Sequence, residues 1–207
     1  MINTSVTSND NLADYIEATL EKYAENPAFS CLGQTLSFAE IEQKSRALAC
    51  FLQQNPALSA GDRIAIQLPN IIQYPIATYA ALRAGLVVVN TNPLYTPREM
   101  QHQFKDSGAK ALIILQDLLP KLEEVKPNTD IELVISTAAP DLLTQDQSDA
   151  PVGCQSFNQI LQRFDGKALA PRPEVSSDDN CVLQYTGGTT GVSKGACLSH
   201  RNIQSNA

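Results

Sequence analysis

The residue types best suited to chemistry gather in one segment, residues 185–195, which reads Tyr-Thr-Gly-Gly-Thr-Thr-Gly-Val-Ser-Lys-Gly. Glycine permits positive φ, so successive backbone N–H groups can turn toward one point and form a nest for phosphate oxygens. The hydroxyl groups add further donors, and the lysine adds a positive charge. We therefore predict a polyphosphate site formed by Thr186, Gly187, Gly188, Thr189, Thr190, Gly191, Lys194 and Gly195.

The order of residues argues against two familiar loop types. A Walker loop has glycine before its lysine and a hydroxyl after it, whereas here Ser193 precedes Lys194 and Gly195 follows it. A nucleophile elbow would use the G-x-S-x-G spelling of residues 191–195, but it needs a strand that runs directly into the turn and an acid later in the chain. Residues 186–190 separate the expected strand from that turn, and no Asp or Glu follows Ser193.

A third interpretation is a resemblance to a known family. Residues 185–195 resemble the phosphate loop of the adenylate-forming superfamily, T/S-G-G/S-T-T-G-x-x-K-G, and residues 196–202 resemble the strand and helix start that follow it. From about Leu12 onward the chain also resembles bacterial long-chain fatty-acid:CoA ligases. That likeness is carried by Leu68-Pro-Asn70, Gln73-Tyr-Pro75, Leu82-Arg-Ala-Gly85, Asn90-Thr-Asn-Pro-Leu-Tyr-Thr-Pro-Arg98 and Asp106-Ser-Gly108. The departures are Ser199, where Thr is usual, and Cys197, where an apolar residue is common.

The resemblance implies a two-step reaction of the intact enzyme. A fatty-acid carboxylate attacks the α-phosphate of ATP and gives acyl-adenylate and pyrophosphate, and the thiol of coenzyme A then displaces AMP. ATP with Mg²⁺ and coenzyme A are the implied co-substrates, and the loop residues would hold the β- and γ-phosphates. We assign no catalytic residue and no metal ligand, because the resemblance places those groups beyond residue 207.

We therefore expect residues 1–207 to be an incomplete N-terminal AMP-binding domain, without the C-terminal domain. Its expected parts are an α/β subdomain over about residues 10–165, a linker over residues 166–180, and a strand, the phosphate loop and a helix start over residues 181–207. The chain alone is expected to lack ligase activity and to bind ATP weakly at most. Two alternatives stay open, namely a noncatalytic binding module and a ligase that adenylates a different carboxylic acid.

The elements that must position the loop follow from apolar spacing and caps. Capping boxes are expected at Ser37-Phe-Ala-Glu40 and Thr96-Pro-Arg-Glu99, and Gly108 is expected to end the second of these helices. Helices are expected over residues 12–23, 38–52, 75–84 and 97–107, and buried strands over 64–68, 86–89, 111–115, 133–135 and 181–185. Connections are expected over 136–156 and 165–180. Strands that are apolar on both faces and alternate with helices indicate a mostly parallel sheet with helices on both faces. The expected fold class is therefore α/β.

Composition limits the partners. The net charge of −7 and the pI near 4.8 argue against nucleic acid, which requires clustered positive charge. Five scattered cysteines without a C-x-x-C pair favour a reducing cytoplasm. Neither a signal peptide nor a transmembrane segment is expected. Small molecules are the expected partners; peripheral membrane association and a homo-oligomer are left open.

Several other residues receive no chemical role. We expect His102 to be solvated and His200 to cap or pack at a helix start. Cys181 and Cys197 are expected to behave as small buried hydrophobic residues. The pair Asp178-Asp179 is interpreted as a turn. The absence of acids after Asp179 suits a site for a phosphate anion.

Overall fold

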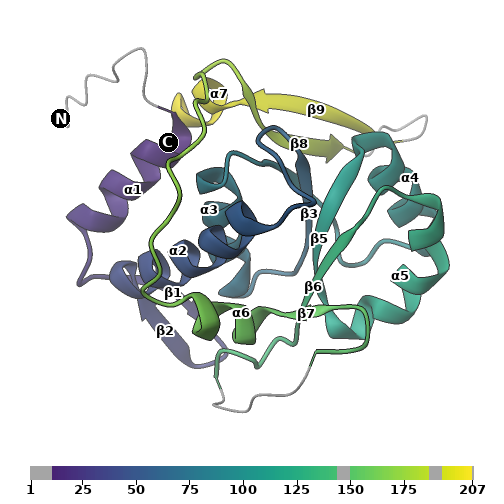
Figure 1. The fold of residues 1–207 in the computed structure, drawn as a ribbon, viewed down its shortest axis with the longest axis horizontal. Helices are drawn as coiled ribbons and strands as arrows, with labels where there is room; N and C mark the ends of the chain where they lie inside the picture. The colour runs from purple at the N-terminus through teal and green to yellow at the C-terminus, as the bar shows by residue number, and fades with distance from the viewer. Residues whose placement is uncertain (1–10, 144–149, 187–192, 207) are drawn as a thin grey trace.

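The computed structural model describes residues 11–143, 150–186 and 193–206, and Figure 1 shows its elements. The helices are α1 (Leu12–Lys22), α2 (Phe38–Gln54), α3 (Gln73–Arg83), α4 (Pro97–Ser107), α5 (Leu119–Val125), α6 (Phe157–Phe164) and α7 (His200–Gln204), with 3₁₀ turns η1 (Gln116–Leu118) and η2 (Lys126–Asn128). The strands are β1 (Pro27–Cys31), β2 (Gln34–Ser37), β3 (Arg63–Gln67), β4 (Val87–Asn90), β5 (Ala109–Leu115), β6 (Leu133–Thr137), β7 (Gln155–Ser156), β8 (Asn180–Thr186) and β9 (Lys194–Ser199).

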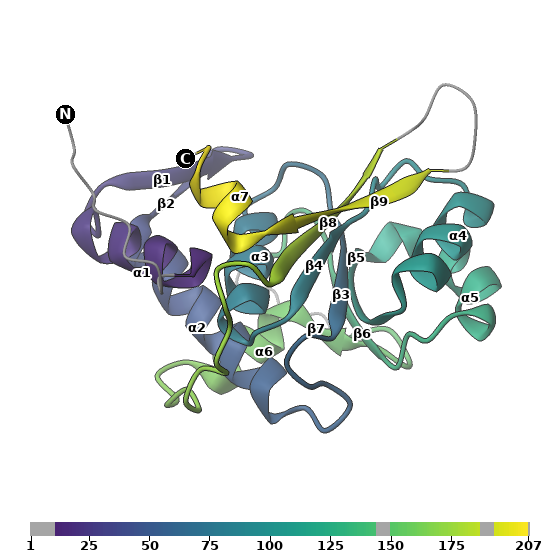
Figure 2. The ribbon, with the colours of Figure 1, turned by 90° about the horizontal axis from the view of Figure 1, so that it is seen from above.

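Seven strands form one sheet in the order β7-β6-β5-β3-β4-β8-β9, while β1 and β2 form a separate antiparallel hairpin. Neighbours in the large sheet are parallel except β8 and β9. In Figure 2 the strands of this sheet run between α1, α2, α3 and α6 on one side and α4 and α5 on the other. The prediction of a mostly parallel sheet with helices on both faces is confirmed.

Each face of the sheet has its own buried apolar cluster. Ile64 and Ile66 belong to the cluster under α2, α3 and α6, whereas Ala65 belongs to the cluster under α4 and α5. Successive strand residues point to opposite faces, so a strand covered on both faces must be apolar at consecutive positions. This explains why the strands appear in the sequence as continuous apolar runs.

The helix starts agree with the local sequence. Ser37 and Glu40 form a reciprocal capping box at the start of α2, and Thr96 and Glu99 form another at the start of α4. Each box satisfies two backbone N–H groups that a helix leaves free. Gly108 ends α4 with φ of 60°, a left-handed conformation that glycine adopts without a steric cost. Both capping boxes and the Gly108 stop are confirmed predictions.

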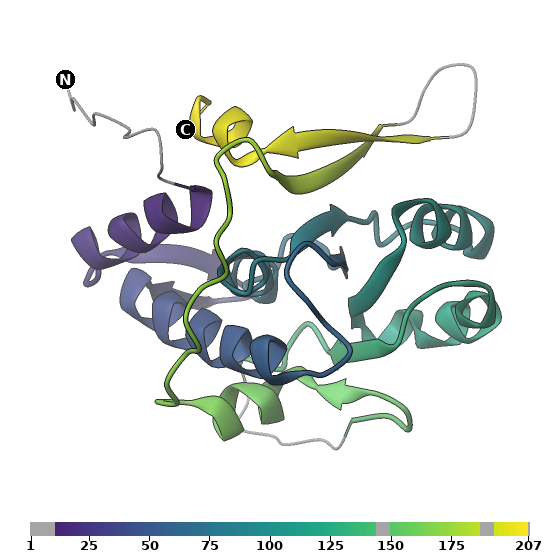
Figure 3. The ribbon, with the colours of Figure 1, turned by 45° about the horizontal axis from the view of Figure 1, so that its top comes forward.

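The segment between α6 and β8 has no helix or strand, but side chains of earlier elements hold it. Figure 3 shows it in light green, passing α2 and α1 on its way to β8. Gln53 exchanges two hydrogen bonds with the backbone of Ala170, at 3.0 and 3.4 Å. Arg172 forms ion pairs with Asp14 and Glu17 of α1. These contacts join the first helix to the strand that leads into the predicted loop.

The structure also contains elements that the sequence patterns did not predict, namely the β1–β2 hairpin, α5 and α6. The expected connection over residues 136–156 is too long at both ends, because β6 continues to Thr137 and β7 begins at Gln155. The helix expected from Pro75 begins two residues earlier, at Gln73. None of these differences changes the order of the strands that lead to the predicted loop.

Candidate functional site

The order of the strands creates a crevice at the carboxyl edge of the sheet. The chain leaves β3 through α3 on one face and leaves the neighbouring β4 through α4 on the other. Open α/β sheets bind ligands where connections diverge in this way. A cleft of about 550 Å³ lies at this position. Its lining residues are Asn70, Tyr74, Asn90, Thr91, Asn92, Pro93, Tyr95, Gln184 and Tyr185.

Neutral polar side chains are linked across this cleft. The phenol of Tyr74 donates to Oδ1 of Asn90, and Nδ2 of Asn90 donates to Oε1 of Gln184 at 2.8 Å. Nε2 of Gln184 donates to the backbone oxygen of Tyr185 at 3.5 Å. Burial raises the pKa of Tyr74, so its phenol stays a donor at neutral pH. These hydrogen bonds hold α3, β4 and β8 in register without adding a charge to the cleft.

Sequence analysis missed this chain of side chains as a functional feature, although a signal for it exists. Asn90 is the last residue of β4, and Gln184 lies near the end of β8. Polar residues that end apolar parallel strands meet at one edge of a sheet. This signal can be recognised only when β4 and β8 are known to be neighbours, because Asn90 and Gln184 are 94 positions apart in the sequence.

The end of β8 and the start of β9 form the two stems of the predicted phosphate loop. Thr186 closes β8 and Lys194 opens β9, and these exposed residues lie opposite each other in antiparallel register. Gly195 lies opposite Tyr185. The other predicted loop residues, Gly187, Gly188, Thr189, Thr190 and Gly191, lie outside the described residues.

Two side chains of α4 contact these stems. Nε2 of His102 lies 2.9 Å from the backbone oxygen of Ser193, which precedes β9. Because a carbonyl oxygen only accepts, Nε2 carries the proton in this contact. Four residues later, Oδ2 of Asp106 accepts a hydrogen bond from the phenol of Tyr185 at 2.6 Å. The expectation that His102 is solvated is wrong, because this imidazole is partly buried and is bound to the backbone of Ser193.

Tyr185 fixes the geometry of the hairpin. Its side chain is buried, and burial first and the neighbouring Asp106 second raise the pKa of its phenol, which therefore stays protonated. A Cβ atom on Gly195 would come within 2.9 Å of the Tyr185 ring. The φ of Gly195 is not positive. Glycine is thus required at position 195 by the close approach of an aromatic ring and not by a left-handed backbone.

The two cysteines beside the loop differ. Cys181 is buried, and its thiol donates to the backbone oxygen of Leu198 at 3.4 Å. Burial raises the pKa of the Cys181 thiol to about 11, so the prediction of a small buried hydrophobic residue is confirmed. The same prediction is wrong for Cys197, which is exposed on β9. β9 ends the sheet, so within the described residues it has a neighbouring strand on one side only.

The remaining singled-out residues are structural. His200 is buried, and its Nδ1 accepts a hydrogen bond from the backbone N–H of Leu12, which confirms a packing role. The N–H of Asp179 donates to the backbone oxygen of Ser176 at 3.0 Å, which confirms a turn at Asp178-Asp179. Among the described residues, no three His, Cys, Asp or Glu side chains are arranged to hold a metal ion. No helix in those ranges has the length and hydropathy of a membrane span.

Comparison with known proteins gives concordant results. A family model described as AMP-binding enzyme matches residues 16–207. A long-chain-fatty-acid–CoA ligase of Yersinia pestis is 42% identical over 95% of this chain, and the match spans only 38% of that relative's length. The solved long-chain-fatty-acid–CoA ligase of Archaeoglobus fulgidus superposes with a TM-score of 0.79 at 26% identity, covering 96% of this chain and 38% of that one.

A second solved structure extends the likeness in fold. An anthranilate CoA ligase in complex with anthranoyl-AMP superposes with a TM-score of 0.83, covering 97% of this chain and 37% of that one. At 20% identity this likeness shows the fold alone. The family model, in contrast, covers nearly the whole chain and includes the hairpin with Thr186 and Lys194. On this evidence, the chain belongs to the AMP-binding enzyme family.

Proposed function

We propose that the protein carrying these residues activates a long-chain fatty acid, first as an acyl-adenylate and then as a coenzyme A thioester. One observation carries the proposal. Thr186 and Lys194 lie opposite each other where β8 ends, beside the cleft at the carboxyl edge of the sheet. That edge is where α/β sheets bind nucleotides. Family membership supports adenylate chemistry, and 42% identity to a long-chain-fatty-acid–CoA ligase supports the acyl substrate.

The first step transfers AMP to the acid. A carboxylate oxygen forms a bond to the α-phosphorus of ATP while the bond from that phosphorus to the β-phosphate bridging oxygen breaks, and pyrophosphate leaves. In the second step the thiol sulfur of coenzyme A bonds to the acyl carbon, the bond from that carbon to the phosphate oxygen breaks, AMP leaves with that oxygen, and the thiol proton is released. The substrates supply both nucleophiles, so the protein has to position groups and stabilise charge.

The residues of the predicted loop fit the phosphates of a nucleotide, because they offer hydroxyl and backbone N–H donors and one ammonium group. In the proposal, the ammonium of Lys194, the hydroxyl of Thr186 and the loop N–H groups bind the departing pyrophosphate. Mg²⁺ bound to ATP would neutralise charge on the phosphate oxygens.

The same proposal keeps the predicted division of the chain into an α/β part to about residue 165, a connection over 166–180 and the loop-bearing part from 181. It also assigns the protein to a reducing compartment, the cytoplasm. All five cysteines are free, which supports that assignment.

The test is ATP–pyrophosphate exchange by the full-length gene product in the presence of a long-chain fatty acid. Lys194→Met and Thr189→Val should each reduce the exchange rate, by about 100-fold for the lysine, as for other donors that stabilise developing charge. Lys105→Met removes the same charge from an exposed position on α4 and is the matched control. It should retain the wild-type rate.

The outcomes separate the alternatives. If exchange requires an aromatic or medium-chain acid, the protein adenylates a different class of carboxylic acid by the same reaction. An absence of exchange with every acid in a panel would contradict the enzyme proposal and support a noncatalytic binding module. A wild-type rate in the Lys194→Met, Thr189→Val double variant would remove the loop from the mechanism.

A further inference from the structure

One face of α4 contacts both stems of the predicted phosphate loop. His102 and Asp106 are one helical turn apart, so their side chains lie on the same face of the helix. His102 binds the backbone oxygen of Ser193 at 2.9 Å, and Asp106 binds the phenol of Tyr185 at 2.6 Å. Tyr185 precedes residues 187–192 of the loop and Ser193 follows them. The two hydrogen bonds therefore fix the chain on both sides of residues 187–192.

The helix that makes these contacts is itself firmly placed. Met100 and Phe104 on its opposite face are fully buried in the cluster under α4 and α5. Nε2 of Gln103 donates to the backbone oxygen of Asn90 at 2.7 Å, which ties α4 to the end of β4. Gly108 stops the helix in a left-handed conformation. Because α4 is fixed to the sheet, His102 and Asp106 can hold the stems at a set separation.

We propose that His102 and Asp106 are positioning residues that hold the phosphate loop through its two stems and thereby set the affinity for the phosphates of ATP. This inference rests on the proposed function, since it assumes that the loop binds ATP. Binding groups that are already held in place lose less conformational entropy when a ligand binds, so fixing the strand ends that carry Thr186 and Lys194 favours phosphate binding. Neither residue contacts the substrate in this proposal. Asp106 acts through Tyr185, and His102 acts through the backbone at Ser193.

The variants Asp106→Ala and His102→Leu test the proposal in the full-length gene product. The readout is ATP–pyrophosphate exchange as a function of ATP and of fatty-acid concentration. Each variant removes one hydrogen bond and should raise the KM for ATP about fivefold to tenfold. The KM for the fatty acid should stay near the wild-type value. Asp106→Asn keeps an acceptor and His102→Gln keeps a donor, so both variants should have a KM for ATP near the wild-type value.

A second measurement checks that Asp106 acts through Tyr185. In a Tyr185→Phe background Asp106 has no phenol to bind, so adding Asp106→Ala should leave the KM for ATP unchanged. Asp130→Ala, at an exposed position away from the hairpin, is the carboxylate control and should behave as wild type.

Three outcomes would contradict either the positioning role of His102 and Asp106 or the proposed function. A wild-type KM for ATP in both Asp106→Ala and His102→Leu would overturn the positioning role while leaving the proposed function intact. A parallel rise in the KM values for ATP and fatty acid, with a lower unfolding midpoint, would mean that the residues only stabilise the fold, which also overturns it. A wild-type protein that catalyses no exchange with any acid would overturn the proposed function itself.

Discussion

The imidazole of His200 accepts a hydrogen bond from the backbone N–H of Leu12, with 3.2 Å between Nδ1 and the amide nitrogen and 188 positions between the residues. Leu12 opens α1, so this N–H is one of the donors that a helix cannot satisfy internally. His200 opens α7 and is 3% exposed. Figures 1 and 3 show the start of α1 beside α7. A titratable group thus joins the first helix to the last.

This contact predicts that stability depends on pH. Burial lowers the pKa of His200 from its usual value of 6.5, with Asp179 and Asp14 opposing the shift and Arg172 adding to it. The unfolded chain therefore binds a proton more readily than the folded one. As a result, the free energy of unfolding falls as the pH drops below about 6.5, and the loss ends below the folded-state pKa. Urea denaturation at several pH values between about 5 and 8 measures this slope.

The variant His200→Gln provides the comparison for that slope. Glutamine offers an oxygen acceptor to the N–H of Leu12 but does not titrate. We expect the variant to show a smaller change in unfolding free energy across the same pH range. Equal slopes in the two proteins would show that His200 does not control the acid sensitivity.

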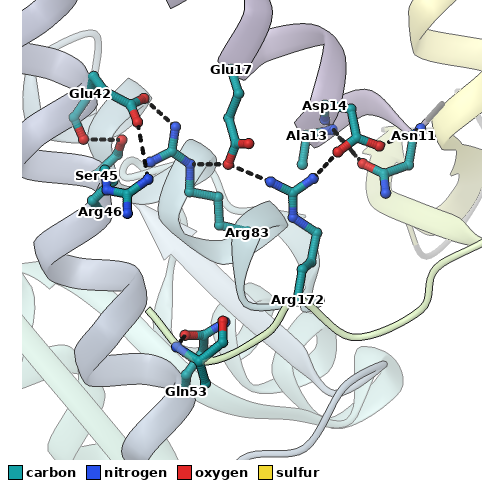
Figure 4. A network of polar contacts seen from close by, with 11 residues as sticks. Asn11, Ala13, Asp14, Glu17, Glu42, Ser45, Arg46, Gln53, Arg83 and Arg172 are labelled. Carbon is teal, nitrogen blue, oxygen red and sulfur yellow. Dashed lines mark hydrogen bonds and ion pairs between the residues drawn. The ribbon is translucent and has the colours of Figure 1, made fainter. Parts of the chain in front are cut away.

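A buried arginine joins three helices near the same end of the molecule. Figure 4 shows Arg83 of α3 between Glu42 of α2 and Glu17 of α1. Arg172 continues the network by pairing with Glu17 and Asp14. Arg83 is 2% exposed, whereas both of its carboxylate partners are partly exposed. The guanidinium of Arg83 is therefore shielded from water more than either carboxylate, so its buried charge depends on these ion pairs for stabilisation.

We predict that Arg83→Met lowers the free energy of unfolding by about 3 kcal/mol, at the low end for a broken buried ion pair, because its carboxylates keep some contact with water. Arg46→Met is the matched control, since Arg46 lies 3.6 Å from the same Glu42 but is 46% exposed. Exposed pairs contribute little, so this variant should change stability by less than about 0.5 kcal/mol. Urea denaturation of both variants decides the point. A loss of similar size in both would contradict the special role of burial.

The features that sequence predicts well are local. The capping boxes at Ser37 and Thr96 and the stop at Gly108 depend on residues within a few positions of each other. The α6 helix also has a local signal that the prediction passed over, because Phe157, Ile160 and Phe164 follow helical spacing. The β1–β2 hairpin has a weaker signal, since its strands are short and half-exposed.

The parts of the site that could not be predicted depend on distant contacts. His102 is a helix residue in a charged stretch, and nothing near it in sequence indicates the contact with Ser193, which is 91 positions away. The link between Asn90 and Gln184 requires that β8 lies next to β4. Strand order is set by how whole helices pack on the sheet, so the phosphate-loop residues could be named from sequence while their supports could not.

The packing of Tyr185 on Gly195 predicts that Gly195→Ala is destabilising. The new Cβ would lie 2.9 Å from a ring that is buried and whose phenol is bound to Asp106, so the ring cannot move aside without losing contacts. We expect a loss of about 1 to 3 kcal/mol in the free energy of unfolding. Ala196→Val adds bulk at the next, exposed position and should be close to neutral. If the clash is the cause, Gly195→Ala should cost less in a Tyr185→Leu background than in the wild type.

The turn between β1 and β2 predicts a stabilising substitution. Cys31 pairs with Gln34, so Leu32 and Gly33 form a two-residue hairpin loop, and both have positive φ, at 51° and 83°. Asn-Gly is the preferred sequence for such a type I′ turn, whereas a leucine there has a steric cost. Leu32 is 62% exposed, so replacing it removes little packing. Leu32→Asn should therefore raise the free energy of unfolding by about 0.5 to 1 kcal/mol, measured by urea denaturation. Leu32→Ala removes the same exposed side chain but lacks the short polar group by which asparagine tolerates positive φ, so it should give no such gain. An equal gain in both variants would show that the exposed leucine, and not the backbone conformation, is the source of the cost.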